Sequence, residues 1–216
     1  MSHMPDSSVE VRPNLPSGAS QPDLKSAAFR PLENELSEAL RAVGVGQWQA
    51  WSKVVSLVAP RALRYARFLT EHDADAEDVV QQTLTRLARQ PSVLQLAEHP
   101  WAYFLRMVRN EAIRFRSRHQ RRIPTEHLTV AEFASHRHVA DPLETAERQQ
   151  LIQTALSSLP PDQAEVVVLK FWEGMTFQEI AAVTSESPNT AASRYRYAIA
   201  KLANLLRSLE GEAIHV

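Results

Sequence analysis

The sequence predicts an all-α protein of two small helical domains joined by a flexible linker. Apolar residues recur at the three- and four-residue spacing of amphipathic helices from residue 31 to residue 118, and again after residue 140. No segment alternates apolar and polar residues as a half-buried strand would. Between the two stretches, residues 119–140 lose the periodicity, which indicates a linker. We therefore expect the domains at residues 31–118 and 141–210.

Residues 1–30 fall outside both domains. They begin with MSHM, which is typical of an expression tag, and continue rich in Pro, Ser and Asp with little apolar periodicity. We expect them to form a disordered tail. No signal peptide follows, which favours the cytoplasm, and no apolar run reaches the roughly 20 residues that cross a bilayer.

The first domain is predicted to be a series of helices with one break in the helical pattern, at a segment bounded by prolines. An apolar stripe precedes residue 45, a long helix covers residues 48–68, and another follows an acidic turn. The segment QPSVLQLAEHP breaks the pattern at Pro91 and Pro100, and a further helix runs from Trp101. The predicted core face of that helix is made by Trp101, Phe104, Leu105, Val108, Ala112 and Phe115.

Charge is segregated along a chain whose formal net charge is only −1. Residues 71–78 hold five acids and no lysine or arginine, whereas residues 101–122 hold seven arginines against one acid, Glu111. Residues 187–209 hold four basic residues and no acid. One acidic and two basic surfaces predict one protein partner and two contacts with a polyanion.

The acidic stretch has an alternative, structural explanation. Asp75 could cap the helix that follows it, and Glu77 and Asp78 in the first turn would favour the positive end of the helix dipole. Glu71 and Asp73 lie outside that explanation, so they leave negative charge for a partner.

The arginine-rich helix has an exposed face opposite its core face, made by Tyr103, Arg106, Asn110, Arg114 and Ser117. An aromatic ring among guanidinium groups and an amide suits single-stranded nucleic acid, whose bases stack and whose phosphates bind arginine. For this helix alone, a solvated face without a ligand is the alternative.

Residues 174–202 predict a helix-turn-helix. Gly174 ends the preceding helix, TFQE at 176–179 is a capping box, and Ser187 caps a second helix that begins at Pro188. The inner face of that helix is predicted to hold Ala191, Tyr195, Ala198, Ile199 and Leu202, and the outer face Thr190, Ser193, Arg194, Arg196, Tyr197 and Lys201. A basic outer face without acids suits the major groove of DNA, and an ordinary solvated helix pair is the alternative.

These elements, in this order, resemble the RNA polymerase sigma-70 family, specifically its extracytoplasmic-function (ECF) group, which keeps only regions 2 and 4. Residues 62–89, with the motif DADAEDVVQ, resemble regions 2.1 and 2.2. Residues 101–122, with VRNEAI, resemble regions 2.3 and 2.4. The segments LPPDQAEVVVL, EGMTFQEIA and SPNTAASRYRYAIAKL resemble region 4.

The resemblance implies a protein that docks on core RNA polymerase, recognises the −35 and −10 elements of promoter DNA and helps to melt it. The implied polymerase-binding residues are Asp75, Glu77, Asp78, Val79 and Gln81. Those implied for the −10 element are Tyr103, Arg106, Arg109, Asn110 and Arg114, with the loop 91–100 capturing a flipped base. Those implied for the −35 element are Thr190, Ser193, Arg194 and Arg196. An anti-sigma factor is a further candidate partner.

The chain departs from the family pattern in the turn, where Thr184, Ser185 and Glu186 replace an apolar residue, glycine and another apolar residue. Ala192 and Ala198 occupy positions that are often basic. We therefore expect weaker or unusual −35 recognition and a looser second domain. Residues 1–45 have no counterpart in the minimal family pattern.

Two other classes of protein stay open on the residues alone. A conventional helix-turn-helix regulator would not explain the acidic helix, and a helical protein-binding adaptor would not explain two faces without acids. Enzyme chemistry finds no support, since the chain has no cysteine, five glycines and no glycine-rich phosphate loop. The eight histidines show no ligand spacing with carboxylates, so we expect no cofactor and no metal, including at His136 and His138 in the linker.

Overall fold

The structure, a computed structural model, describes residues 26–70, 72–120 and 154–213. Within these ranges the chain forms helices and short turns and contains no strand, which confirms the predicted all-α class. No helix in the described part of the chain is long and apolar enough to cross a membrane. Most of the predicted tail and linker, including His136 and His138, lies outside the described residues.

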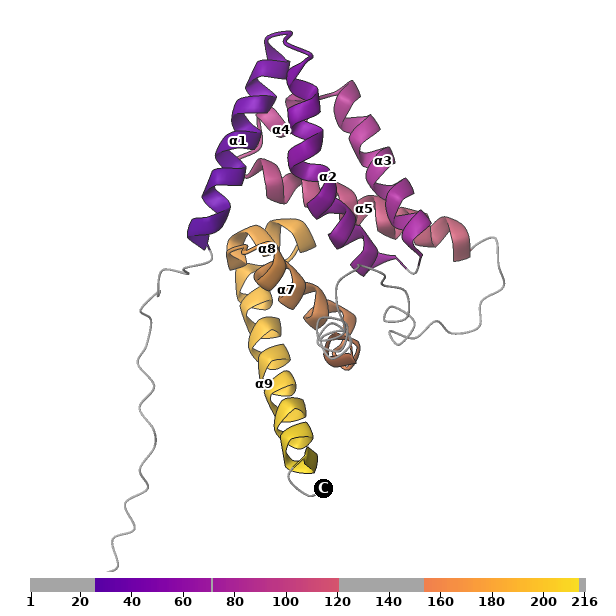
Figure 1. The fold of residues 1–216 in the computed structure, drawn as a ribbon, viewed down its shortest axis with the longest axis vertical. Coiled ribbons are helices and arrows are strands. Elements are labelled where there is room, and N and C mark those ends of the chain that lie inside the picture. Colours follow the sequence, from indigo (N-terminus) through magenta and orange to yellow (C-terminus); the bar gives the residue numbers. More distant parts are fainter. Residues whose placement is uncertain (1–25, 71, 121–153, 214–216) are drawn as a thin grey trace, which may run out of the picture.

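The N-terminal domain consists of α1 (Ser26–Gly44), α2 (Ala50–Leu69), α3 (Asp73–Arg89), the short α4 (Ser92–Gln95) and α5 (Pro100–Gln120). Helices α1, α3 and α5 all pack against α2 (Figure 1). The predicted core face of α5 is confirmed, because its apolar residues from Trp101 to Ala112 are buried and Phe115 packs at the edge of the core. Helix α1 begins before Pro31, since SAAFR favours a helix and a proline near the start removes few hydrogen bonds.

The C-terminal domain consists of α7 (Pro161–Trp172), α8 (Phe177–Thr184) and α9 (Pro188–Ala213). The predicted ends and caps of these helices are confirmed. Gly174 has a φ of 60°, and Thr176 and Glu179 form the capping box, in which the Thr176 amide donates to Glu179 Oε2 at 2.7 Å. Ser187 Oγ accepts from the amide of Thr190 at 3.0 Å, so it caps α9. These local hydrogen bonds fix where α8 and α9 begin.

The atypical turn between α8 and α9 keeps the helix-turn-helix geometry without glycine. Ser185 itself adopts the left-handed conformation, with φ 62° and ψ 42°. Thr184 is buried, and its hydroxyl donates to the carbonyl of Ile180 at 3.0 Å. Glu186 forms an ion pair with Arg194 of α9. The polar residues of the turn thus bond to the backbone of α8, through Thr184, and to α9, through Glu186.

Replacing Ser185 by glycine should raise the free energy of unfolding by about 0.5–1 kcal/mol. An L-residue is strained in the left-handed region, and the extra freedom of glycine in the unfolded chain cancels only part of the gain. Urea unfolding followed by circular dichroism measures the difference. Ser56→Gly, an exposed site with right-handed backbone in α2, is the matched control and should destabilise by about 0.5 kcal/mol. A Ser185→Gly chain no more stable than its parent would contradict the strain.

The two domains share one hydrophobic core. Val166, Leu169 and Ile180 of the C-terminal domain belong to the same buried cluster as Phe104 and Val108 of α5. Helix α8 lies beside α5 (Figure 1). The chain is therefore folded back on itself, and we call this the packed arrangement of the two domains.

Candidate nucleic-acid and partner interfaces

The acidic surface lies on the first half of α3. Glu77, Asp78 and Gln81 are exposed, as a docking surface requires, whereas Val79 is fully buried. Val79 therefore packs α3 against the core, which leaves Glu77, Asp78 and Gln81 facing solvent. The capping explanation for Asp75 is wrong, because α3 starts at Asp73 and the residue before it, His72, takes the cap position.

An apolar groove runs beside the acidic surface, between α2 and α3. It has a volume of about 700 Å³ and is lined mainly by apolar side chains, among them Trp51, Leu63, Val80 and Leu84. Glu77 and Gln81 line the same groove. The surface therefore combines negative charge with a recess that accepts apolar side chains.

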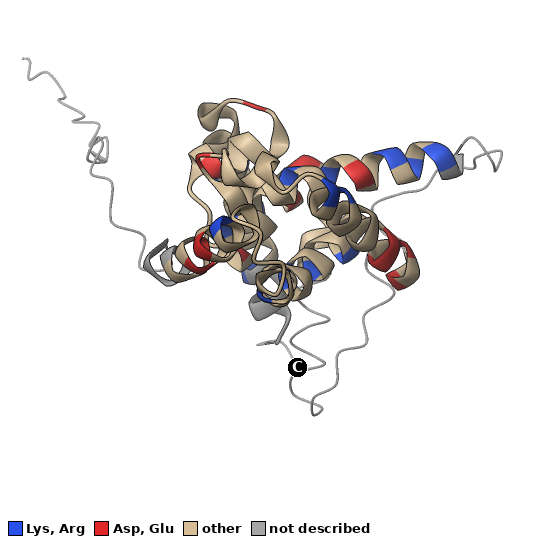
Figure 2. Cartoon of the chain, turned by 90° about the horizontal axis from the view of Figure 1, so that it is seen from above, with Lys and Arg blue, Asp and Glu red and all other residues tan. Residues whose placement is uncertain are grey.

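The exposed stripe of α5 lies where the sequence predicted it. Tyr103, Arg106 and Arg114 are exposed and Asn110 is half-buried. Figure 2 shows basic residues along the end of α5, which runs away from the rest of the molecule, and acidic residues at the start of α3 as a separate group. The stripe is accessible in the packed arrangement.

Glu111, the single acid of the arginine-rich segment, is buried beside the stripe and anchors several arginines. Its carboxylate accepts hydrogen bonds from Arg86 and Arg118, each at 2.8 Å, and from Arg114 at 3.4 Å. It thus ties α5 to α3 and neutralises part of the basic charge in the second half of α5.

Arg109 lies apart from the stripe, on the flank of α5 that faces the C-terminal domain. Its Nε and Nη2 donate to the two oxygens of Glu165 in α7, at 2.8 and 3.2 Å. The hydroxyl of the fully buried Tyr65 donates to Glu165 Oε1 at 2.6 Å. Arg109 can therefore contact the −10 element only after this bidentate ion pair with Glu165 breaks.

A second buried acid, Glu173, holds the end of α7 against α2. It pairs with Arg64, which also donates to the carbonyl of Trp172 at 3.1 Å, and it lies 3.7 Å from Arg61. Burial raises the pKa of the Glu173 carboxyl more than Arg64, Arg61 and Trp101 lower it. The domains are thus joined by buried ion pairs as well as by apolar packing.

Glu165 and Glu173 are functional candidates that the sequence analysis missed. Both are acids within an otherwise apolar run, AEVVVLKFWEG, where a buried carboxylate needs a partner. That signal could have marked them as members of buried ion pairs. It could not have named Arg109 or Arg64, because the pairs join residues more than fifty positions apart.

The outer face of α9 is smaller than predicted. Arg196 and Tyr197 are exposed, and Ser193 and Thr190 are half-buried. Arg194 instead bends toward the protein, where it pairs with Glu186 and, at 3.1 Å, with Asp162 of α7. Its position on the helix explains this, because it lies closer to the inner face than Ser193 or Arg196 does.

Comparison with known proteins agrees with this arrangement. Residues 54–122 match the family model for Sigma-70 region 2, and residues 149–202 match that for Sigma-70, region 4. An RNA polymerase sigma-E factor of Streptomyces avermitilis is 32% identical over 152 residues, which cover 70% of this chain and 82% of that protein. The chain belongs to the sigma-70 family.

The ECF group within that family is also shown. The ECF RNA polymerase sigma factor SigL of Mycobacterium tuberculosis is 30% identical to this sigma factor over 146 residues, which cover 68% of this chain and 82% of that one. The sigma factor RpoE of Bartonella quintana, solved with the anti-sigma factor NepR, has a similar fold. Its TM-score is 0.57 at 23% identity, covering 72% of this chain and 96% of that one. This protein is thus an ECF sigma factor of RNA polymerase, a DNA-binding initiation factor whose partners are core polymerase and promoter DNA.

Proposed function

We propose that the three surfaces of this sigma factor divide the work of initiation, with α3 docking on core polymerase, α5 holding the separated strand and α9 reading the upstream duplex. The observation that carries the proposal is the stripe of α5, an exposed tyrosine among arginines and an amide opposite the core. Such a surface binds unstacked bases and phosphates at once. The protein acts as an initiation factor rather than an enzyme, in the cytoplasm, where core polymerase works.

Docking rests on the acidic surface together with the neighbouring groove. Glu77, Asp78 and Gln81 offer charge and hydrogen bonds, and the groove between α2 and α3 offers apolar area. A partner helix with basic residues beside an apolar side chain complements both features. Asp75 and Val79 contribute less directly, since one is half-buried and the other fully buried.

Upstream recognition is assigned to the exposed part of α9. Arg196 carries the principal base contact, with Ser193, Thr190 and Tyr197 beside it. Arg194 supports the turn through Glu186 and reaches DNA only if it leaves that ion pair. An anti-sigma factor is included as a candidate partner, because the structure with a TM-score of 0.57 to this chain holds a sigma factor together with the anti-sigma factor NepR.

A pre-melted promoter tests the division of work. Tyr103→Ala with Asn110→Ala should impair strand opening while closed-complex formation stays nearly intact, because stacking matters only once bases leave the duplex. Arg196→Ala should weaken upstream binding by about 1–3 kcal/mol, as for a lost base contact. Transcription assays with core polymerase on duplex and bubble templates measure both effects.

The bubble should rescue the α5 variant and leave the Arg196→Ala defect in place. Arg207→Ala is the matched control, because it removes the same charge from the same helix outside the proposed contact. Equal rescue of both variants, or of neither, would show that melting and duplex reading are not divided between α5 and α9.

A further inference from the structure

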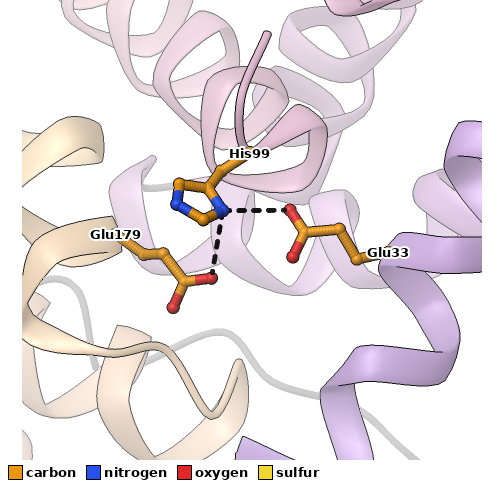
Figure 3. A group of neighbouring side chains, drawn as sticks. All are labelled: Glu33, His99 and Glu179. Atoms are coloured by element: carbon orange, nitrogen blue, oxygen red, sulfur yellow. Dashed lines mark ion pairs between the residues drawn. The ribbon is translucent and has the colours of Figure 1, made fainter.

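Three side chains from separate parts of the chain meet between the two domains. Glu33 lies on α1, His99 precedes α5 and Glu179 lies in the first turn of α8 (Figure 3). His99 Nδ1 is 3.8 Å from Glu33 Oε1 and 3.9 Å from Glu179 Oε1. The three atoms lie within 4.8 Å of one another. Two carboxylates and one imidazole thus point at a common centre.

The atoms of this group that face one another form no hydrogen bonds among themselves, so they can bind a metal ion. Both distances from the imidazole nitrogen exceed hydrogen-bonding range. Glu33 Oε1 is buried and has no hydrogen-bond partner. The Oε2 of Glu179 is engaged by the amide and hydroxyl of Thr176, which turns its Oε1 toward His99.

Electrostatics also favour a cation at this centre. Burial raises the pKa of the Glu33 carboxyl, and the nearby carboxylate of Glu179 raises it further. His99 and the backbone amide of Trp101 lower that pKa and offset part of the cost. A bound divalent cation would relieve the repulsion between the two carboxylates.

We propose that Glu33, His99 and Glu179 form a binding site for a divalent transition-metal ion, with Zn²⁺ as the ion that fits best. Zn²⁺ binds imidazole nitrogen and carboxylate oxygen at about 2.0–2.2 Å, so two of its tetrahedral ligands are about 3.4 Å apart. The distances of 3.8 and 3.9 Å need to shorten only slightly to reach that geometry, and the two carboxylate oxygens, which lie within 4.8 Å of each other, must also move closer. Water completes the coordination, whereas Mg²⁺ and Ca²⁺ prefer a shell of oxygens.

The site joins the two domains, so metal binding is coupled to the packed arrangement. Glu33 and His99 belong to the N-terminal domain and Glu179 to the C-terminal domain. Any ligand that binds only the packed arrangement stabilises it by a factor of one plus the ratio of free metal to Kd, about 100-fold at 100 times Kd. These three ligands are far apart along the chain, so no ligand spacing in the sequence indicates the site.

Equilibrium dialysis and calorimetry with Zn²⁺ alone test the site on the full chain at pH 7.5. Because the chain has eight histidines, the decisive quantity is the loss of one bound equivalent in a variant. Glu33→Gln, His99→Gln and Glu179→Gln should each remove it, weakening binding there by more than about 100-fold. Glutamine can still accept in the capping box, so Glu179→Gln keeps α8 folded. His72→Gln and Glu38→Gln, exposed and outside the group, are the matched controls and should bind as the parent does.

Distance measurements separate a metal bridge from the alternatives. The chain has no cysteine, so Gln82→Cys and Ala200→Cys, both exposed, accept a pair of labels across the two domains. Zn²⁺ should increase the population with the short distance in the parent and not in His99→Gln. Unchanged stoichiometry in all three ligand variants would overturn the site and place the metal at other histidines. A label distance that Zn²⁺ leaves unchanged in the parent would overturn the coupling of metal binding to the packed arrangement.

Discussion

Replacing Glu165 by alanine should separate the C-terminal domain from α5 and release Arg109. Glu165 accepts from Arg109 and Tyr65, and its side chain is only 7% exposed. The variant leaves a guanidinium and a phenol without a partner at the interface, and breaking a buried ion pair in this way costs about 3–5 kcal/mol. The ratio of packed to separated molecules should therefore fall by about 100-fold or more, which is the factor that corresponds to this energy.

The label pair at positions 82 and 200 measures the separation, and circular dichroism checks that the helices stay folded. Glu38→Ala, an exposed acid on α1, is the matched control and should leave the distance unchanged. Combining Glu165→Met with Arg109→Met and Tyr65→Phe should restore packing, because apolar residues of similar volume often replace a buried pair without loss. If the single variant keeps the parent distance, the ion pair does not hold the domains together.

Release of Arg109 should also change DNA binding. In Glu165→Ala the guanidinium becomes available beside the α5 stripe, so affinity for single-stranded promoter DNA should rise. Adding Arg109→Ala should remove that gain while the domains stay apart. A gain that persists without Arg109 would instead show that separation exposes some other part of the surface.

Local chemistry explains why the helix boundaries of the C-terminal domain were predictable from the sequence. Gly174, Thr176 with Glu179, and Ser187 with Pro188 each set a helix boundary through contacts a few residues apart, and the structure shows these contacts. Apolar spacing predicted the buried face of α5 for the same reason. Such features depend on neighbours in the sequence and on the helical repeat.

Contacts between side chains of different elements explain the features that could not be predicted from the sequence. Arg109 seemed to belong with the exposed arginines of α5, but its surroundings are decided by Glu165, which lies on a different domain. Arg194 was assigned to the outer face of α9 because the turn acid Glu186 was not counted as its partner. The Glu33, His99 and Glu179 group likewise depends on how α1, α5 and α8 meet. Periodicity along one helix carries no information on the partner of Arg109 or on the Glu33, His99 and Glu179 group.

Reversing Glu77 and Asp78 to lysine should abolish binding to core polymerase while leaving the fold intact. Like charges placed across an interface cost several kcal/mol, so affinity should fall by about 100-fold or more. The structure weakens the alternative explanation, because only Asp73 and Asp75 occupy the first turn of α3. A charge near a helix start contributes at most about 0.3–1 kcal/mol and less beyond the first turn, so stability should change little.

The matched control for this reversal is Glu38→Lys with Glu98→Lys, which changes the net charge equally at two exposed sites outside α3. It should bind core polymerase nearly as the parent does, with any general charge effect screened by added salt. Affinity measured against purified core polymerase, with thermal unfolding of each variant, separates docking from stability.

A further substitution, Leu84→Asp in the adjacent groove, should weaken docking even in high salt, because it places a charge in the apolar recess. Equal loss of affinity in the control would show that net charge governs polymerase binding. Retention of affinity in Glu77→Lys with Asp78→Lys would move the docking surface away from α3.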